Sequence, residues 1–121
     1  MLDTHVVIWW RQNAPQLSAE AREVIAAAPL VYVSAASAWE VAIKIALGKL
    51  RIPGAFGQAV EDSQFTKLPV DFDHAATAGS LPTHHTDPFD RMLIAQARLE
   101  ALVIVTHDRN FDPYDVPIVW T

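Results

Sequence analysis

The fold of this chain is organised around the stretch DPFDRMLIAQA at residues 87–97. Asp87 is a favourable helix N-cap, and Pro88 suits the first helical position, where no amide hydrogen is needed. A helix that begins here turns Asp90 toward its apolar side and Arg91 toward its solvated stripe. A carboxylate that faces the protein must be paired, hydrogen-bonded or bound to a metal ion. The simpler alternative is a capping-box-like acid that bonds back to the Asp87 amide.

The composition is that of a globular chain. Of the 121 residues, 51% are hydrophobic and 19% are charged, so we expect a single domain over residues 1–121. No apolar run is long enough to cross a membrane, and we see no signal peptide. The absence of cysteine excludes disulfides and thiolate metal sites, which fits a cytoplasmic protein.

The formal net charge of −5 bears on the choice of ligand. A protein that binds nucleic acid through bulk electrostatics is usually basic. Either nucleic acid is not a ligand of this chain, or cations bring it to an acidic site.

Periodicity, caps and β-rich segments predict the secondary structure. Helices are expected at residues 4–11, 18–28, 34–47, 58–64, 72–80 and 88–101. Strands are expected at residues 30–33, 67–70, 102–106 and 116–120, with residues 1–3 as the tail of a further short strand. Pro117 places the last of these strands at an edge of the sheet. The alternation of strands and helices indicates an α/β fold with a parallel sheet.

Three acids have ordinary structural roles that also bring them together. Asp3 and Asp90 suit helix N-termini, and Asp108 suits an Asx-type turn after a strand. The carboxyl ends of parallel strands meet at one edge of a sheet, and this is the edge where α/β folds bind ligands. The three carboxylates should therefore lie at the same edge.

Glu40 lies about a turn and a half into the helix predicted at residues 34–47 and can reach the same edge. Its alternative roles are a capping box with Ser37 and an (i, i+4) ion pair with Lys44. Lys44 could also position Glu40 or meet a phosphate, but a solvated partner of Glu40 is the simpler interpretation. Four converging carboxylates repel one another unless a cation neutralises them. Oxygen ligands without cysteine favour Mg²⁺ or Mn²⁺ over zinc.

The histidines and tryptophans say less about the function than the acids do. No pair of histidines has the spacing of zinc ligands on a helix face. His107, beside Asp108, could orient a substrate, although a histidine in a turn usually faces solvent. Trp9 and Trp10 on a short helix indicate packing or an interface rather than a base-stacking platform.

Four motifs together resemble those of PIN domains and, more narrowly, of VapC-type toxins from bacterial toxin–antitoxin pairs. They are LDTHV at residues 2–6, SAWEVAIK at 37–44, DPFDR at 87–91 and VTHD at 105–108. Each motif is weak alone, but their order and spacing are specific and extend over nearly the whole chain. The resemblance implies a three-layer α/β/α sandwich whose central, mostly parallel sheet has four or five strands. It also implies a metal-dependent endoribonuclease, usually a homodimer, that a VapB-type antitoxin inhibits.

The resemblance also implies roles for single residues. Carried over by motif, the catalytic and metal-binding set is Asp3, Glu40, Asp90 and Asp108, with Asp87 kept as a neighbouring cap. Bound Mg²⁺ or Mn²⁺ would lower the pKa of a water molecule and neutralise charge on the RNA phosphate, which answers the objection from net charge. Family members usually have a few more apolar residues before the first acid, a departure that we expect to affect stability more than chemistry.

Of three alternatives, the sequence argues against the first two and leaves the third open. A non-catalytic PIN-like interaction module would not need all four acids. A phospho-acceptor receiver domain needs an adjacent acid pair after its first strand and a late lysine, whereas Asp3 stands alone and no lysine follows Lys67. A metal-dependent DNA nuclease would share the same chemistry, because the metal site does not distinguish the sugars.

Overall fold

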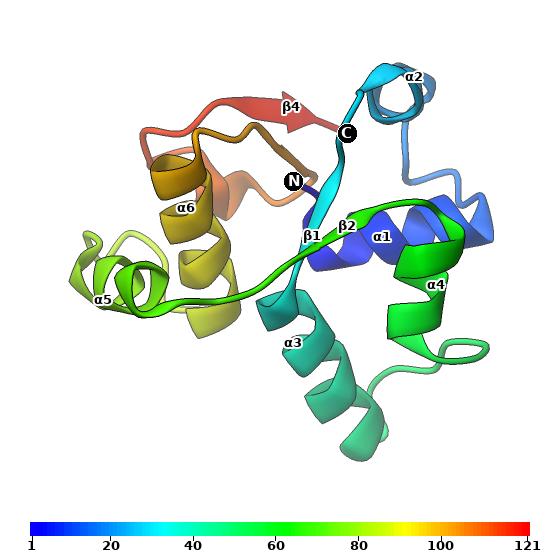
Figure 1. Cartoon of the computed structure of the whole chain (residues 1–121), viewed down its shortest axis with the longest axis horizontal. Helices are drawn as coiled ribbons and strands as arrows, with labels where there is room; N and C mark the ends of the chain where they lie inside the picture. The colour runs from blue at the N-terminus through cyan, green and yellow to red at the C-terminus, as the bar shows by residue number, and fades with distance from the viewer.

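The computed structural model describes residues 1–121 and consists of helices around short parallel strands (Figure 1). The helices are α1 (Thr4–Gln12), α2 (Ala19–Ala27), α3 (Ala35–Ala46), α4 (Phe56–Asp62), α5 (Phe72–Ser80) and α6 (Pro88–Glu100). The strands are β1 (Tyr32–Ser34), β2 (Thr66–Leu68), β3 (Ile104–Thr106) and β4 (Ile118–Trp120), and the 3₁₀-helix η1 (Arg109–Phe111) follows β3. All six predicted helices are present, and none is long and apolar enough to cross a membrane.

The strands are shorter than predicted. Strands β1 and β3 each begin two residues later than their β-rich segments, and each has three residues. Leu30 and Val103, which the prediction included, are 53% and 43% exposed. Their high β-propensity is not matched by burial, and burial against neighbours is what stabilises a strand.

Residues 1–3 connect two pairs of parallel strands. Strand β1 pairs with β2, and β3 pairs with β4. Leu2 forms a parallel bridge with Val105 of β3, and its N–H donates to the carbonyl of Tyr32 in β1 at 3.0 Å. The N–H of Asp3 donates to the carbonyl of Val105 at 3.0 Å. The N-terminal segment therefore lies between β1 and β3, and β4 pairs on one side only, as predicted for an edge strand.

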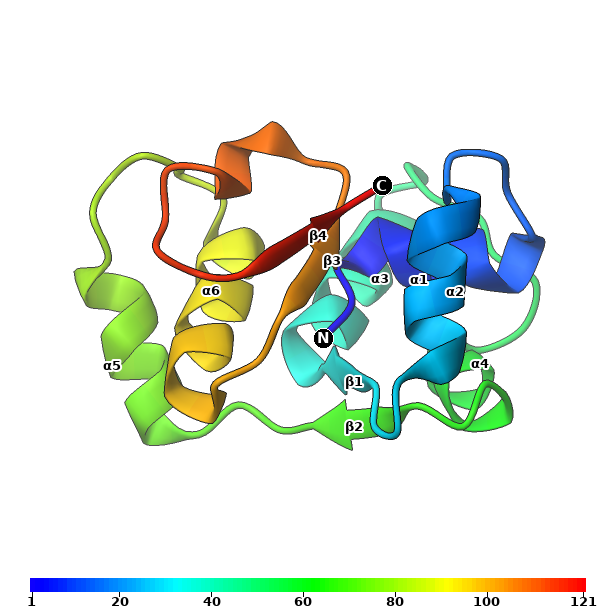
Figure 2. The same ribbon diagram turned by 90° about the horizontal axis from the view of Figure 1, so that it is seen from above.

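Alternating side chains along this arrangement face two helical layers. Ile104 belongs to a buried cluster with residues of α5 and α6, whereas Leu2 and Val105 belong to a second cluster with residues of α1, α2 and α4. Figure 2 shows α5 and α6 on one side of β3 and β4, and α1 and α2 on the other. The α/β/α layering implied by the resemblance is therefore confirmed.

The direction of the elements decides where the acids lie. Helix α6 connects to β3 through a turn at Ala101, which has a left-handed φ of 54°. The helix therefore runs back along the sheet, and its N-terminus lies at the carboxyl ends of the strands. Asp3 ends the N-terminal segment, and α3 begins directly after β1. The predicted site residues thus come from several elements that meet at one edge.

Candidate active site

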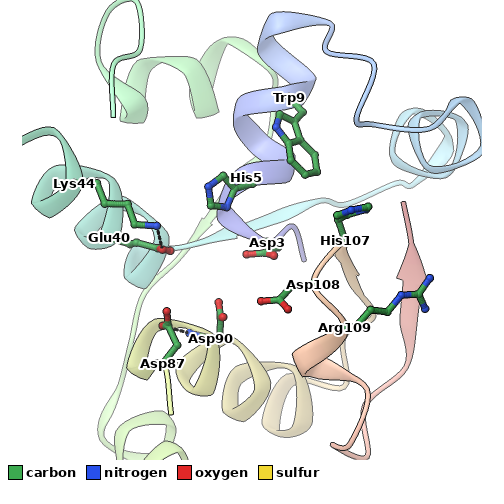
Figure 3. A pocket seen from close by; sticks show the side chains of 10 residues that line it. All are labelled: Asp3, His5, Trp9, Glu40, Lys44, Asp87, Asp90, His107, Asp108 and Arg109. Atoms are coloured by element: carbon green, nitrogen blue, oxygen red, sulfur yellow. Dashed lines mark hydrogen bonds and ion pairs between the residues drawn. The ribbon is translucent and has the colours of Figure 1, made fainter. Parts of the chain in front are cut away.

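A cleft of about 450 Å³ opens at the carboxyl edge of the strands (Figure 3). All four acids singled out in the sequence line it, and the carboxylates of Asp3, Asp90 and Asp108 point toward one another. The other lining residues are His5, Trp9, Lys44, Asp87, His107 and Arg109. Five carboxylates thus face one lysine and one arginine, so an anionic ligand needs additional positive charge here.

Asp3 is buried and held on both of its oxygens. Its Oδ1 accepts from the Thr4 N–H at 2.7 Å, which caps α1, and its Oδ2 accepts from the Thr106 hydroxyl at 2.7 Å. Burial raises the pKa of Asp3, while the hydrogen bonds from Thr106 and Thr4 oppose that change. The cap predicted from the sequence is present, and the same geometry aims the carboxylate into the cleft.

Glu40 is buried on α3, between a hydroxyl and an ammonium group. Its Oε1 accepts from the Thr4 hydroxyl at 2.7 Å, and its Oε2 accepts from the Lys44 ammonium at 2.8 Å. The hydrogen bond to Glu40 raises the pKa of Lys44. The predicted ion pair between Glu40 and Lys44 is therefore confirmed.

The predicted capping box of Ser37 with Glu40 is wrong. A capping box with Glu40 requires Ser37 as the N-cap, but the N-cap of α3 is Ser34, three residues earlier. The hydroxyl of Ser34 accepts from the Ala36 N–H at 3.0 Å. Ser37 lies inside the helix, buried, and its hydroxyl is 2.8 Å from that of Thr4. Ser37 and Glu40, the buried polar residues of α3, thus face Thr4 of α1 rather than solvent.

Asp90 lies in the first turn of α6, beside its cap. The carboxylate of Asp87 accepts from the N–H groups of Phe89 and Asp90 at 2.8 and 3.1 Å, as predicted for an N-cap. The carboxylate of Asp90 does not return to the Asp87 amide; its Oδ2 lies 2.6 Å from Nε2 of His85. Burial, reinforced by the charge of Asp3, raises the pKa of Asp90 to about 7, and the hydrogen bond with His85 opposes this change.

Asp108 combines a turn with a free carboxylate oxygen. Its Oδ1 accepts from the Asn110 N–H at 2.9 Å and caps η1, as predicted for an Asx-type turn. Its Oδ2 lies 4.0 Å from Nε2 of His85. The turn role and the orientation toward the cleft are therefore compatible.

His85 is the site residue that the sequence analysis did not single out. It contacts Asp90, lies near Asp108, and its side chain is only 13% exposed. Together the three residues present one nitrogen and two oxygen ligand atoms within 4.8 Å of one another. In the sequence, His85 is only a histidine five residues before Asp90. Because residue spacing in a loop does not determine where a side chain points, the contact with Asp90 could not be predicted.

Arg91 fixes the loop that carries His85, and the prediction that it points to solvent is wrong. Its guanidinium donates to the carbonyls of Ala78, Leu81, Pro82 and His85 at 2.8–3.2 Å. Five donors in a planar fork suit a set of carbonyls that no helix or sheet satisfies. The guanidinium of Arg91 thus supplies the hydrogen-bond donors that backbone N–H groups would supply in a helix or sheet.

Another histidine, His74, lies outside the cleft. Its Nδ1 accepts from the Asp71 N–H at 3.1 Å, and its Nε2 lies 2.9 Å from Oε1 of Glu100. The two acids face different ring nitrogens, and one ligand atom from each of the three residues lies within 4.8 Å of the others. This arrangement caps α5 and ties it to α6.

The converging oxygen atoms fit a hard divalent cation. Asp3, Asp90 and Asp108 supply carboxylates from three elements, and the chain has no sulfur ligand from cysteine. Such a ligand set suits Mg²⁺ or Mn²⁺. Glu40 differs from the three aspartates in that it forms an ion pair with Lys44, which sets it slightly apart from them.

Comparisons with known proteins agree with this architecture. The family model of the PIN domain matches residues 1–117, and no curated protein was found to be similar. A similar solved chain belongs to VapBC2 from Rickettsia felis, crystallised bound to a DNA fragment from their promoter, with a TM-score of 0.72 and 15% sequence identity. The similarity covers 98% of this chain and 96% of that chain, and at this identity it concerns the fold. Because the family model covers nearly every residue, including all four acids singled out in the sequence, this chain belongs to the PIN domain family.

Proposed function

We propose that this PIN domain is a VapC-type toxin: a divalent-metal-dependent endoribonuclease that hydrolyses RNA phosphodiester bonds. PIN domains are nucleases, and the observation that carries the proposal is the convergence of Asp3, Asp90 and Asp108 in one cleft. The four motifs and the fold shared with a chain of a VapBC complex support the narrower assignment.

Asp3, Asp90 and Asp108 would hold the Mg²⁺ or Mn²⁺ ion, with Glu40 completing the acidic set. When bound, a cation of this kind makes water a nucleophile near neutral pH and offsets charge on the phosphate. The surrounding residues keep the ligands in place: the Thr106 hydroxyl fixes one oxygen of Asp3.

His85 and Lys44 hold Asp90 and Glu40 in the same way. His85 holds one oxygen of Asp90 at 2.6 Å and leaves the other free to face Asp3 and Asp108. Lys44 holds one oxygen of Glu40 in place through a hydrogen bond at 2.8 Å. A carboxylate that is held before a ligand arrives loses less conformational freedom on binding.

The test is RNA cleavage by the purified protein with Mg²⁺, with Mn²⁺ and with excess chelator. We expect cleavage only with a metal ion, and loss of cleavage in Asp90→Asn. Asp73→Asn is a matched control, because Asp73 is also in the first turn of a helix but is exposed and does not line the cleft. Undiminished cleavage in chelator would refute the metal mechanism, and preferential cleavage of DNA with the same sequence would favour the alternative of a DNA nuclease.

We also propose a VapB-type antitoxin partner and a homodimer, both of which the resemblance to VapC-type toxins implies. An antitoxin that places an arginine or lysine among the carboxylates would inhibit by taking the position of the metal charge. Light scattering of the chain alone and with the product of the neighbouring reading frame tests both points. A protein that stays monomeric at high concentration and does not bind that product would contradict them.

A further inference from the structure

We propose that Trp9, together with His5 and His107, forms a stacking shelf for one nucleobase of a single-stranded nucleic acid. The shelf lies in the same cleft as the acids. This inference rests on the proposed function, because the stacked base would belong to a nucleotide next to the phosphate that is cleaved.

The three rings form one wall of the cleft (Figure 3). The ring of Trp9 has its centroid 6.0 Å from that of His5, with the planes inclined by 39°, and 5.9 Å from that of His107, with the planes at 76°. Trp9 therefore supplies the stacking face of the shelf, and the two imidazoles border it. His5 and His107 are exposed, and Trp9 is half-buried. The imidazole of His107 is oriented by a hydrogen bond that its Nδ1–H donates to the carbonyl of Thr121.

Trp9 stands out chemically in this cleft. It is the one hydrophobic side chain among the ten residues that line it, the others being charged residues and histidines. Its neighbour Trp10 lies elsewhere, 5.7 Å from the ring of Phe65 and beneath the guanidinium of Arg22 at 5.3 Å. The sequence-based expectation of packing therefore describes Trp10 well, whereas Trp9 also presents an aromatic surface to the site.

An aromatic surface next to converging acids suits a nucleotide. The acids and their cation engage a phosphate, whereas a base needs a flat partner, and stacking on aromatic side chains accepts any base. The cleft volume of about 450 Å³ is in the range of pockets that enclose small organic ligands, so it accommodates a nucleotide unit. Arg109, whose guanidinium lies 4.1 Å from the ring of Trp120, adds a positive charge at the cleft for a neighbouring phosphate.

The test measures binding without cleavage. Labelled single-stranded RNA heptamers, intact or lacking one base at each position in turn, are titrated in Ca²⁺ in place of Mg²⁺, with gels to verify that the RNA stays whole. We expect the wild type to lose affinity by about 5- to 150-fold when one particular base is removed, the range that stacking on one aromatic ring supports. Trp9→Ala should lose a similar factor with intact RNA, and removal of that base should then have no further effect.

Two further variants make the result specific. Trp9→Phe keeps an aromatic face and should retain most of the affinity. Phe72→Ala removes a 93% exposed aromatic side chain outside the cleft and should bind like the wild type. If Trp9→Ala fails to fold, Trp9→Phe and the base-removal series on the wild type still decide the question.

The outcomes separate this inference from the proposed function. A wild type that is indifferent to base removal at every position overturns the shelf, even if the protein cleaves RNA. Equal, additive losses from Trp9→Ala and from base removal also overturn it, because they show two independent contacts. A base-specific loss that disappears in Trp9→Ala supports the shelf even if no cleavage is seen in Mg²⁺.

Discussion

Asp90 is the carboxylic acid of the cleft whose ionised form is strongly disfavoured by its surroundings. Burial, with the charge of Asp3, raises its pKa from 3.8 to about 7. A carboxyl group whose pKa is higher in the folded than in the unfolded protein favours folding while it is protonated. That contribution is complete below about pH 4 and is lost as the pH rises through about 7, and each pKa unit between the two states corresponds to roughly 1.4 kcal/mol. Above about pH 7 the metal-free protein therefore bears an ionised Asp90, which disfavours folding.

We expect Asp90→Asn to stabilise the metal-free protein at about pH 8, where the ionised carboxylate of the wild type is costly. Each kcal/mol gained should raise the melting temperature by roughly 3–6 °C for a domain of this size. The difference should shrink toward about pH 4, and Mg²⁺ should raise the melting temperature of the wild type but barely that of the variant. Thermal melts with chelator and with Mg²⁺ measure this. A variant that melts clearly lower without metal, with its Mg²⁺ response intact, would mean that Asp90 mainly anchors the helix.

The same pKa predicts how metal affinity depends on pH. A proton and a cation compete for Asp90, so the apparent Mg²⁺ affinity should fall about tenfold between about pH 8 and about pH 6. Calorimetric titrations at a series of pH values measure the midpoint of this change. Affinity that is flat over this range would exclude Asp90 as the group that titrates.

His85 provides the control for that experiment. Because its hydrogen bond lowers the pKa of Asp90, His85→Ala should move the midpoint to higher pH. His84→Ala should leave the midpoint unchanged, since His84 is exposed and contacts only the ring of Tyr114 among aromatic groups. Equal changes in both variants would point to a disturbed loop instead of a lost hydrogen bond.

At the scale of elements, helices were readable from the sequence and the loop before α6 was not. N-cap residues such as Ser34 and Asp87 mark the start of a helix through local hydrogen bonds, so a helix start can be predicted from the nearby sequence. The observed helix ends differ from the predicted helix ends by at most two residues. The path of the loop depends on Arg91, whose partners lie 6–13 residues away and are backbone carbonyls that carry no sequence signal. The four acids were recognisable by residue type and order, whereas the position of His85 follows from that path.

Arg91 therefore supports a prediction about the loop as a unit. Arg91→Ala leaves several partly buried carbonyls without a donor and should lower the free energy of unfolding by about 2–4 kcal/mol. Arg98→Ala, an exposed arginine on the same helix, should change it by less than about 0.5 kcal/mol. Urea titrations of the three proteins give these values. Similar stabilities for both variants would show that the guanidinium contacts contribute little.

At the scale of the whole molecule, two buried clusters share one narrow sheet. Ile104 and Leu2 lie on opposite faces, each almost fully buried. The resemblance to PIN domains implied this layering, but the sequence did not show that residues 1–3 lie between β1 and β3. Three residues are too few for a pattern, and the pairing is decided by partners that are distant in sequence.

If the two clusters form one cooperative unit, truncation on either face should affect the same transition. Leu2→Ala and Ile104→Ala should each lower the stability by about 2–5 kcal/mol while thermal unfolding stays a single step. The exposed Leu99→Ala is the control, with little change expected. A second transition in either variant would contradict the assignment of residues 1–121 to one domain.

The central position of the segment with Asp3 has a consequence for biosynthesis. Asp3 leaves the ribosome long before Val105 and Thr106, the residues that fix its backbone and its carboxylate, and so it waits for partners about one hundred residues further along the chain. Contacts of such separation form late in folding. A nascent chain that ends before Val105 therefore has its first acid but no assembled cleft, and the hydrolytic activity proposed for this protein would begin only after residues 105–108 have been translated.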